Sequence, residues 1–178
     1  MFAGVIFDVY QWDQLLFDGS TRRFEKLRRP DTVLVIPVTS DGKVVFAVEQ
    51  QPGSEVVVQF PGGRVEENED PFSAAKRELL EETGLEAEEL VLIDEVQPVT
   101  KIEWRVYTFV ARRCHQVTEQ QLDPGERIQL EYMSVDEAIA RMAAEDFPDA
   151  KGKLAHLAVQ AEFSALKRQE LRNLLVGS

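Results

Sequence analysis

The stretch from Gly63 to Leu85, which reads GRVEENEDPFSAAKRELLEETGL, constrains the fold and function of this chain more than any other part of it. Asp70 predicts the N-cap of a helix, and Pro71 suits the first helical position. Gly84 suits the residue just past the carboxyl end, because glycine adopts the left-handed backbone conformation that often ends a helix. The stretch therefore predicts a glycine-containing turn that leads into one well-capped helix.

This predicted helix carries acidic residues at a spacing that stability alone does not favour. Glu78 and Glu82 are four residues apart and share one face, and Glu81 borders that face. Like charges at this spacing oppose helix formation by about a few tenths of a kcal/mol per pair, and the helix dipole disfavours anions in the last turns. A hard divalent cation would relieve this repulsion, because such ions prefer oxygen ligands. The plain alternative is a solvated acidic helix face.

The whole pattern resembles the Nudix box of the Nudix hydrolases and matches it at every specified position: Gly63, Glu69, Arg77, Glu78, Leu79, Glu81, Glu82, Gly84 and Leu85. The order of strands and helices around the box agrees with the same family over most of the chain. The resemblance implies an α/β/α sandwich that hydrolyses a nucleoside diphosphate linked to another group X.

The resemblance also implies roles for individual residues. The metal ligands for Mg²⁺, or Mn²⁺ in its place, would be Gly62 through its carbonyl oxygen, Glu78, Glu81 directly or through water, and Glu82. Arg77 would hold the glutamates by ion pairing, and Glu69 would be structural. No covalent nucleophile is required, because bound metal ions acidify the attacking water and neutralise the departing phosphate oxygens.

Three features resemble the ADP-ribose and nucleotide-sugar pyrophosphatase branch: about thirty residues before Pro30, the PGGRVE run at 61–66, and a late acidic loop. In that branch a loop glutamate beyond the box acts as a catalytic base or an extra metal ligand. Glu126 is the candidate here, with Glu131 and Asp123 as alternatives. An ordinary solvent-exposed loop acid is the competing interpretation of Glu126.

Two segments differ from the ADP-ribose enzymes, so the broader class of nucleoside diphosphate sugars is predicted. Residues 49–53 lack the expected Arg-Gln-Tyr-Arg character, and residues 100–105 replace a loop of Ser-Pro-Gly type. Among nearby side chains, Arg64 and Lys101 are predicted to meet phosphates, and Trp104 to stack on a base or sugar. The alternative for Trp104 is packing within a strand.

Elsewhere, apolar and β-branched runs between turn residues predict strands. These are Phe2–Gln11, Thr21–Leu27, Thr32–Thr39, Val44–Gln50, Val56–Phe60, Leu90–Val96, Glu103–Arg112 and Ile128–Met133. Cys114–Glu126 predicts a loop, and a capping box at Ser134 predicts a second helix to about Ala143. Apolar spacing over Asp149–Leu175 predicts a carboxyl-terminal helical segment.

The predicted fold class is α+β, with a mixed sheet flanked by helices. We expect residues 1–30 to form an N-terminal β-hairpin extension that serves as a dimer contact, and residues 31–178 to form the Nudix domain. The branch often forms homodimers through its N-terminal strands, so a homodimer is expected here.

The charge balance limits the partners. Thirty-two acidic against twenty basic residues give a formal charge of −12, which argues against nucleic-acid binding. The single cysteine excludes a disulfide framework and a cysteine-based zinc site. No apolar run is long enough for a membrane span, and the N-terminus lacks the basic region of a signal peptide. We therefore expect a cytoplasmic protein that binds a small nucleotide and neither nucleic acid nor membrane.

The predicted function is Mg²⁺-dependent hydrolysis of an ADP-ribose-like nucleoside diphosphate sugar to a nucleoside monophosphate and a sugar phosphate, by metal-activated water. The catalytic residues would be Glu82, Glu81, Glu126 and Arg77. One alternative is a nucleoside triphosphate pyrophosphohydrolase. Another is a catalytically silent Nudix module that only binds nucleotides, although all four glutamates of the box are present.

Overall fold

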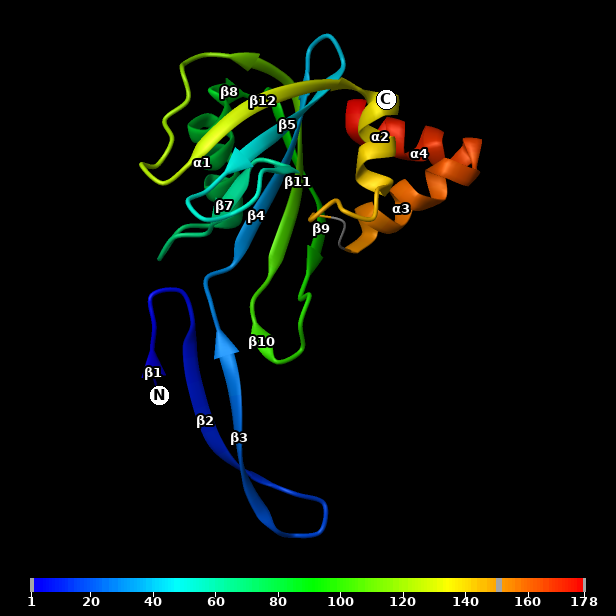
Figure 1. Ribbon diagram of the computed structural model, residues 1–178. Helices are drawn as coiled ribbons and strands as arrows, with labels where there is room; N and C mark the ends of the chain where they lie inside the picture. The colour runs from blue at the N-terminus through cyan, green and yellow to red at the C-terminus, as the bar shows by residue number, and fades with distance from the viewer. Residues whose placement is uncertain (1, 150–151, 178) are drawn as a thin grey trace.

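A long β-hairpin extends away from a sheet that is covered by helices in the computed structural model, which describes residues 2–149 and 152–177 (Figure 1). The hairpin consists of β2 (Asp8–Leu15) and β3 (Thr21–Arg28), paired antiparallel in unbroken register. Short strands β1 (Phe2–Ala3) and β10 (Ile102–Glu103) flank it. The hairpin is as predicted, but the single strand expected over Phe2–Gln11 is wrong, because a turn from Gly4 to Phe7 interrupts it.

The main sheet has the order β12-β5-β4-β11-β8, and β6, β7 and β9 pair with β5, β4 and β11. Its strands are β4 (Thr32–Thr39), β5 (Lys43–Gln50), β6 (Val57–Gln59), β7 (Gly62–Arg64), β8 (Leu85–Glu86), β9 (Glu89–Val96), β11 (Val106–Gln116) and β12 (Arg127–Ser134). The central pair β4 and β11 is parallel, whereas the β4–β5, β5–β12 and β9–β11 pairs are antiparallel. The sheet is therefore mixed, as predicted.

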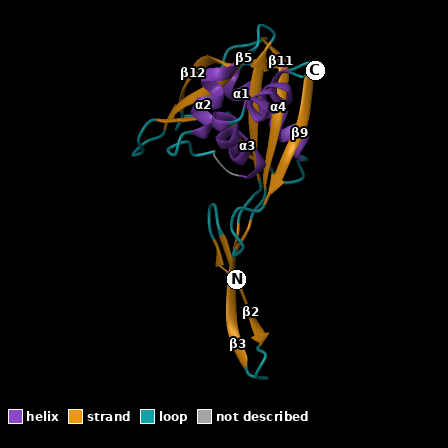
Figure 2. Ribbon diagram, turned by 90° about the vertical axis from the view of Figure 1, so that its right-hand side faces the viewer, coloured by secondary structure: helices purple, strands orange, loops and turns teal. Residues whose placement is uncertain are grey.

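Helices cover both faces of this sheet and leave the hairpin bare (Figure 2). Helix α1 (Pro71–Thr83) packs on one face, and α2 (Val135–Ala143), α3 (Gly152–Phe163) and α4 (Ala165–Val176) pack on the other. Because successive strand residues point to opposite faces, Val33 and Val35 of β4 belong to the core under α1, whereas Ile36 and Val38 belong to the core under the other helices. The α/β/α sandwich of an α+β protein is thus confirmed.

The strand predicted over Glu103–Arg112 is divided in two. β10 pairs with β3 of the hairpin, and β11 pairs with β4 of the main sheet, so the chain passes from one sheet to the other between them. The backbone N–H of Arg105 donates to the Asp31 carboxylate (2.7 Å), and the Thr32 N–H donates to the Arg105 carbonyl (2.9 Å). These long-range contacts replace the regular strand ladder at Trp104 and Arg105.

Two other boundaries differ from the prediction. The loop expected from Cys114 begins only after Gln116, because β11 continues past an irregularity at Arg113 and pairs with β8. The carboxyl-terminal helical segment is two helices, separated at Ser164, whose side chain accepts from the Lys167 N–H. Residues 150–151, within the range predicted to be helical, lie outside the described residues.

The helix expected after Ser134 is confirmed as α2, which begins with the predicted capping box. Among the helices of the described ranges, none has the length and apolar character needed to cross a membrane.

Candidate active site

Helix α1 begins and ends where the sequence predicts. The Asp70 carboxylate accepts from the backbone N–H groups of Phe72 (3.0 Å) and Ser73 (3.2 Å), which satisfies donors that the helix leaves unpaired. Gly84 ends the helix at a φ of 69°, where a side chain would also clash with the Thr118 carbonyl. The two caps set the bounds of α1, and helix periodicity then places Glu78 and Glu82 on one face.

Glu78 and Glu82 lie on the inner side of α1 and are only 8% and 7% exposed. They face β7, where Gly63 lets the Glu78 side chain approach closely and Gly62 lets β7 lie close to β4. A Cβ at Gly63 would clash with the Glu78 carboxylate, and a Cβ at Gly62 would clash with the Val33 carbonyl. The Gly62 N–H donates to Glu82 Oε2 at 2.9 Å. The structure thus places the Gly62 backbone beside the helix glutamates. That the Gly62 carbonyl binds a metal ion stays a prediction.

Arg77 connects the acidic groups of the box. Its guanidinium contacts Glu69 (3.0 Å), Glu78 (2.7 Å) and Glu81 (3.0 Å), and donates to the Arg64 carbonyl (2.9 Å). Arg77 lowers the pKa of the Glu69 carboxyl, and Glu69 in turn raises the pKa of Arg77. Arg77 therefore joins the helix, the loop before it and strand β7, an arrangement that agrees with the positioning role predicted for it.

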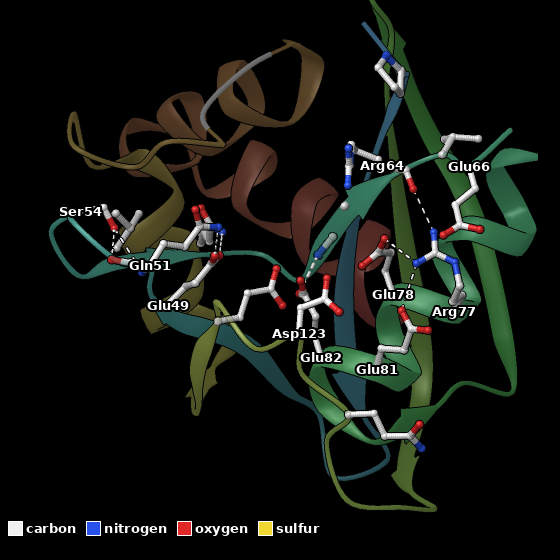
Figure 3. A pocket seen from close by; sticks show the side chains of 18 of the residues that line it. Glu49, Gln51, Ser54, Arg64, Glu66, Arg77, Glu78, Glu81, Glu82 and Asp123 are labelled. Carbon is white, nitrogen blue, oxygen red and sulfur yellow. Dashed lines mark hydrogen bonds and ion pairs between the residues drawn. The ribbon is translucent and has the colours of Figure 1, made fainter. Parts of the chain in front are cut away.

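Arg77 and the helix glutamates Glu78, Glu81 and Glu82 line a cavity of about 1010 Å³ whose lining is strongly acidic. Figure 3 shows Arg77, Glu78 and Glu81 on one side of the cavity, with Glu49, Gln51 and Ser54 on the opposite side. The acidic residues of the lining are Glu49, Glu55, Glu66, Glu67, Glu78, Glu81, Glu82, Asp123 and Glu126, and its basic residues are Arg64 and Arg77.

The acids perturb one another in this cavity. The pKa of Glu82 is raised to about 9, chiefly by burial and to a smaller extent by the charges of Glu78, Glu49 and Glu126, against the Gly62 N–H, which lowers it. Burial also raises the pKa of Glu78 and of Glu126. Several carboxylates that repel one another away from bulk water form a set that a cation would stabilise.

The donor set fits a hard divalent cation by its chemistry, since carboxylate oxygens are the ligands that Mg²⁺ prefers. Within residues 2–149 and 152–177, however, no three acidic, histidine or cysteine side chains stand close enough together to hold a metal ion as they are. Arg77 engages Glu78 and Glu81 instead. Metal binding at Glu78, Glu81 and Glu82 stays a prediction that requires these side chains to turn toward the ion.

The loop between β11 and β12 brings Glu126 and Asp123 to the same cavity. Gln120 donates from its side chain to the Glu82 carbonyl, and the Gln121 N–H donates to the Glu81 carbonyl at 2.8 Å. The loop is thereby bonded to the last turns of α1. The third candidate, Glu131, lies exposed on β12 and does not line the cavity.

The three residues predicted to bind substrate do not line one common cavity. Arg64 lines the acidic cavity, whereas Trp104 lines a second cavity of about 960 Å³. Trp104 donates from Nε1 to Thr32 Oγ1 (2.9 Å), and the Arg29 guanidinium lies 4.7 Å from its ring centroid. Trp104 lies between two strands, so the strand position considered for it is wrong. Lys101 lines neither of these two cavities.

Sequence reasoning did not single out Arg29, Glu49 or the glutamines that contact Glu49. The sequence feature that could have indicated Arg29 is the basic pair Arg28-Arg29, which stands directly before Pro30. Glu49 gave no local signal, because its burial depends on strands that pair across the sheet.

Comparisons with known proteins agree with this geometry. The model of the NUDIX domain matches residues 28–156. An ADP-ribose pyrophosphatase of Bacillus subtilis (strain 168) is 28% identical over 163 residues, which cover 85% of this chain and 83% of the relative. A methanol dehydrogenase activator of Bacillus methanolicus is 31% identical over 173 residues, which cover 95% of this chain and 92% of that protein.

A solved structure described as an ADP compounds hydrolase superposes on this chain with a TM-score of 0.73 at 21% identity. The superposition covers 96% of this chain and 92% of the other. That likeness confirms the fold. With the complete box in place and the domain model matching most of the chain, this protein belongs to the NUDIX family, as a hydrolase similar to the ADP-ribose pyrophosphatases.

Proposed function

We propose that this protein hydrolyses the diphosphate bond of a nucleoside diphosphate sugar of the ADP-ribose type, giving a nucleoside monophosphate and a sugar phosphate with Mg²⁺, or Mn²⁺ in its place. The observation that carries the proposal is the acidic cavity, in which buried Glu78 and Glu82 and the loop residue Glu126 line the same space. Similarity to the ADP-ribose pyrophosphatase of Bacillus subtilis supports the choice of substrate.

Glu78, Glu81 and Glu82 would hold the metal, with the Gly62 carbonyl as a further oxygen donor. Bound Mg²⁺ would offset the charge that develops on the diphosphate and lower the pKa of the attacking water. Glu126 takes the proton of that water, since burial raises its pKa toward the range useful for a base. A phosphate leaving group is stable as an anion, so no strong general acid is needed.

The two cavities suggest how the substrate lies. They share part of their lining, namely Pro30 and the run Val65–Glu67, so one extended molecule can occupy both. In our proposal the nucleoside enters the second cavity and contacts Trp104, the diphosphate lies beside Arg64, and group X lies in the acidic cavity. Lys101 stays a prediction with no contact to either space.

The test is product release from a panel of nucleotide sugars, dinucleotides and nucleoside triphosphates, each measured with Mg²⁺, with Mn²⁺ and with chelator. We expect turnover of a nucleoside diphosphate sugar that chelator abolishes. Glu82→Gln is expected to lower kcat by about 10³-fold, and the matched change Glu86→Gln, at an exposed site on β8, to leave it unchanged.

Other outcomes would replace the proposal. Turnover of triphosphates alone would indicate a nucleoside triphosphate pyrophosphohydrolase. Nucleotide binding without turnover would indicate a silent binding module, and near-normal kcat in Glu82→Gln would contradict the assigned metal ligands.

We also propose that the protein is a cytoplasmic homodimer whose subunits meet through the hairpin. Trp12, Phe17 and Phe24 are exposed on the hairpin, where apolar side chains gain from burial against a second copy. Light scattering of the wild type and of Trp12→Ser measures the oligomeric state, and a wild-type monomer contradicts this proposal. Cell fractionation tests the location.

A further inference from the structure

Glu49 is a buried carboxylate in the lining of the acidic cavity, on the side opposite Arg77, Glu78 and Glu81 (Figure 3). It lies on β5 and is 8% exposed. Burying an ionised carboxylate is costly unless other groups satisfy it, so its partners show what the site is built to do.

Both partners of Glu49 are neutral amides. Gln51 donates from Nε2 to Glu49 Oε1 at 2.6 Å, and Gln59, on β6, donates from Nε2 to Glu49 Oε2. Within the described residues no arginine, lysine or histidine forms an ion pair with Glu49. The amides fix the carboxylate in place, while its negative charge is left without a cationic partner.

A carboxylate has about four acceptor positions, and each oxygen of Glu49 uses one of them for an amide. The positions that remain can accept hydrogen bonds from donors in the cavity. Sugar hydroxyls are such donors, whereas an ionised phosphate offers no protons and carries charge of the same sign. The chemistry of this side therefore favours an uncharged, hydroxyl-bearing group.

The neighbouring charges strengthen this preference. Asp123 and Glu126 line the same cavity, and its two arginines are Arg64 and Arg77, of which Arg77 is engaged by three glutamates. An anion placed here would meet repulsion that a sugar would not.

We propose that Glu49 determines specificity for group X: held by Gln51 and Gln59, it accepts hydrogen bonds from the hydroxyls of an uncharged sugar and repels a group X that ends in phosphate. This inference rests on the proposed function and adds a selectivity residue to it. Glu49 acts on binding of X rather than on the attacking water.

The probes are the α,β-methylene analogue of ADP-ribose, which resists cleavage, and the same compound carrying a phosphate on its terminal ribose. Their Kd values are measured by calorimetry with Mg²⁺ on the full chain. For the wild type we expect the phosphorylated analogue to bind at least about tenfold more weakly, the scale of one charge-assisted hydrogen bond.

Glu49→Gln keeps the size of the side chain and removes the charge. The ratio measured is the Kd of the phosphorylated analogue divided by the Kd of the unphosphorylated one. Glu49→Gln is expected to reduce this ratio at least about fivefold, because it weakens binding of the unphosphorylated analogue and relieves the repulsion of the phosphorylated one. The control is Glu55→Gln, an exposed acid in the lining of the same cavity, for which the ratio is expected to stay within about twofold of the wild-type value. Glu49→Asp, which withdraws the carboxylate by one methylene, is the second variant if Glu49→Gln does not fold, and it is also expected to lower the ratio.

A wild-type ratio near one, or a ratio that Glu49→Gln or Glu49→Asp leaves unchanged, overturns the inference.

Kinetics on ADP-ribose separate the inference from the proposed function. If the wild type hydrolyses ADP-ribose while the ratio is insensitive to Glu49, the inference fails and the function stands. If the ratio depends on Glu49 but no diphosphate is hydrolysed, the function fails and the selectivity stands. If neither analogue binds the wild type, both are wrong.

Discussion

The Glu78 carboxylate occupies the space that a side chain at residue 63 would need. Gly63 is therefore required by the position of this carboxylate. Because Glu78 is buried between α1 and β7, a side chain added at residue 63 would force its carboxylate out of this position.

Gly63→Ala is expected to displace the Glu78 carboxylate and lower kcat by about 10²-fold, the effect of a misplacement near 1 Å in an active site. Stability should fall far less, because the displaced atoms are the end of a side chain. Parallel kinetics and thermal unfolding measure the two effects. Gly125→Ala, where an added Cβ meets nothing within 4 Å, controls for the effect of the added methyl group on stability. Unchanged kcat in Gly63→Ala would contradict the close fit.

Arg77→Lys is expected to lower the free energy of unfolding by about 1–2 kcal/mol and activity by about tenfold or more. Lysine keeps the charge but cannot form the planar set of contacts to Glu69, Glu78 and Glu81. Urea unfolding and kinetics provide the measurement. Arg113→Lys is the matched control, since its ion pairs with Glu88 and Glu89 are at the surface and are expected to contribute under about 0.5 kcal/mol. Equal effects of the two variants would argue against a special role of Arg77.

The ion pair of Glu69 predicts a pH dependence of stability. Arg77 lowers the pKa of Glu69 below its ordinary value of 4.5, with a smaller contribution from the Glu66 N–H, against burial and Asp70, which raise it. The folded state therefore binds this proton less readily than the unfolded state, so the stabilisation is present above about pH 4.5 and is lost as the pH falls through the lower, folded-state pKa.

Unfolding measured from pH 7 to pH 3 is expected to show a smaller loss of stability for Glu69→Gln than for the wild type. The difference should appear below about pH 4.5, where only the wild type gains a proton on this carboxyl. Parallel curves for the two proteins would show that the ion pair contributes nothing to folding.

Gln120→Ala is expected to lower kcat by about tenfold while KM stays within about twofold. Its side chain bonds the loop of Glu126 to the Glu82 carbonyl at the end of α1, so its loss is expected to move Glu126, the proposed base, without removing a group proposed to contact the substrate. Steady-state kinetics separate the two constants. Gln129→Ala, at an exposed site on β12, is the control. A rise in KM with unchanged kcat would show that the loop binds substrate and does not position the base.

Local chemistry made the box helix predictable. Its N-cap, first proline and C-cap act within a few residues, so Asp70, Pro71 and Gly84 mark the bounds that the structure confirms. The same holds for α2 and its capping box. The strand over Glu103–Arg112 could not be divided correctly from sequence, because the interruption depends on Asp31, more than seventy residues earlier in the chain.

The candidate site divides in the same way. The sequence by itself determined the α1 glutamates and their common face, since helix periodicity places residues three and four apart on one side. The glycine-containing turn expected before this helix is wrong, because Gly62 and Gly63 lie in strand β7 and pair with β4. Only the tertiary structure decided that Trp104 lines a separate cavity, that Lys101 lines neither, and that Glu49 lies opposite the box with two glutamines as partners. Those positions follow from the pairing of distant strands, and pairing is a property of the assembled sheet that no short stretch of sequence encodes.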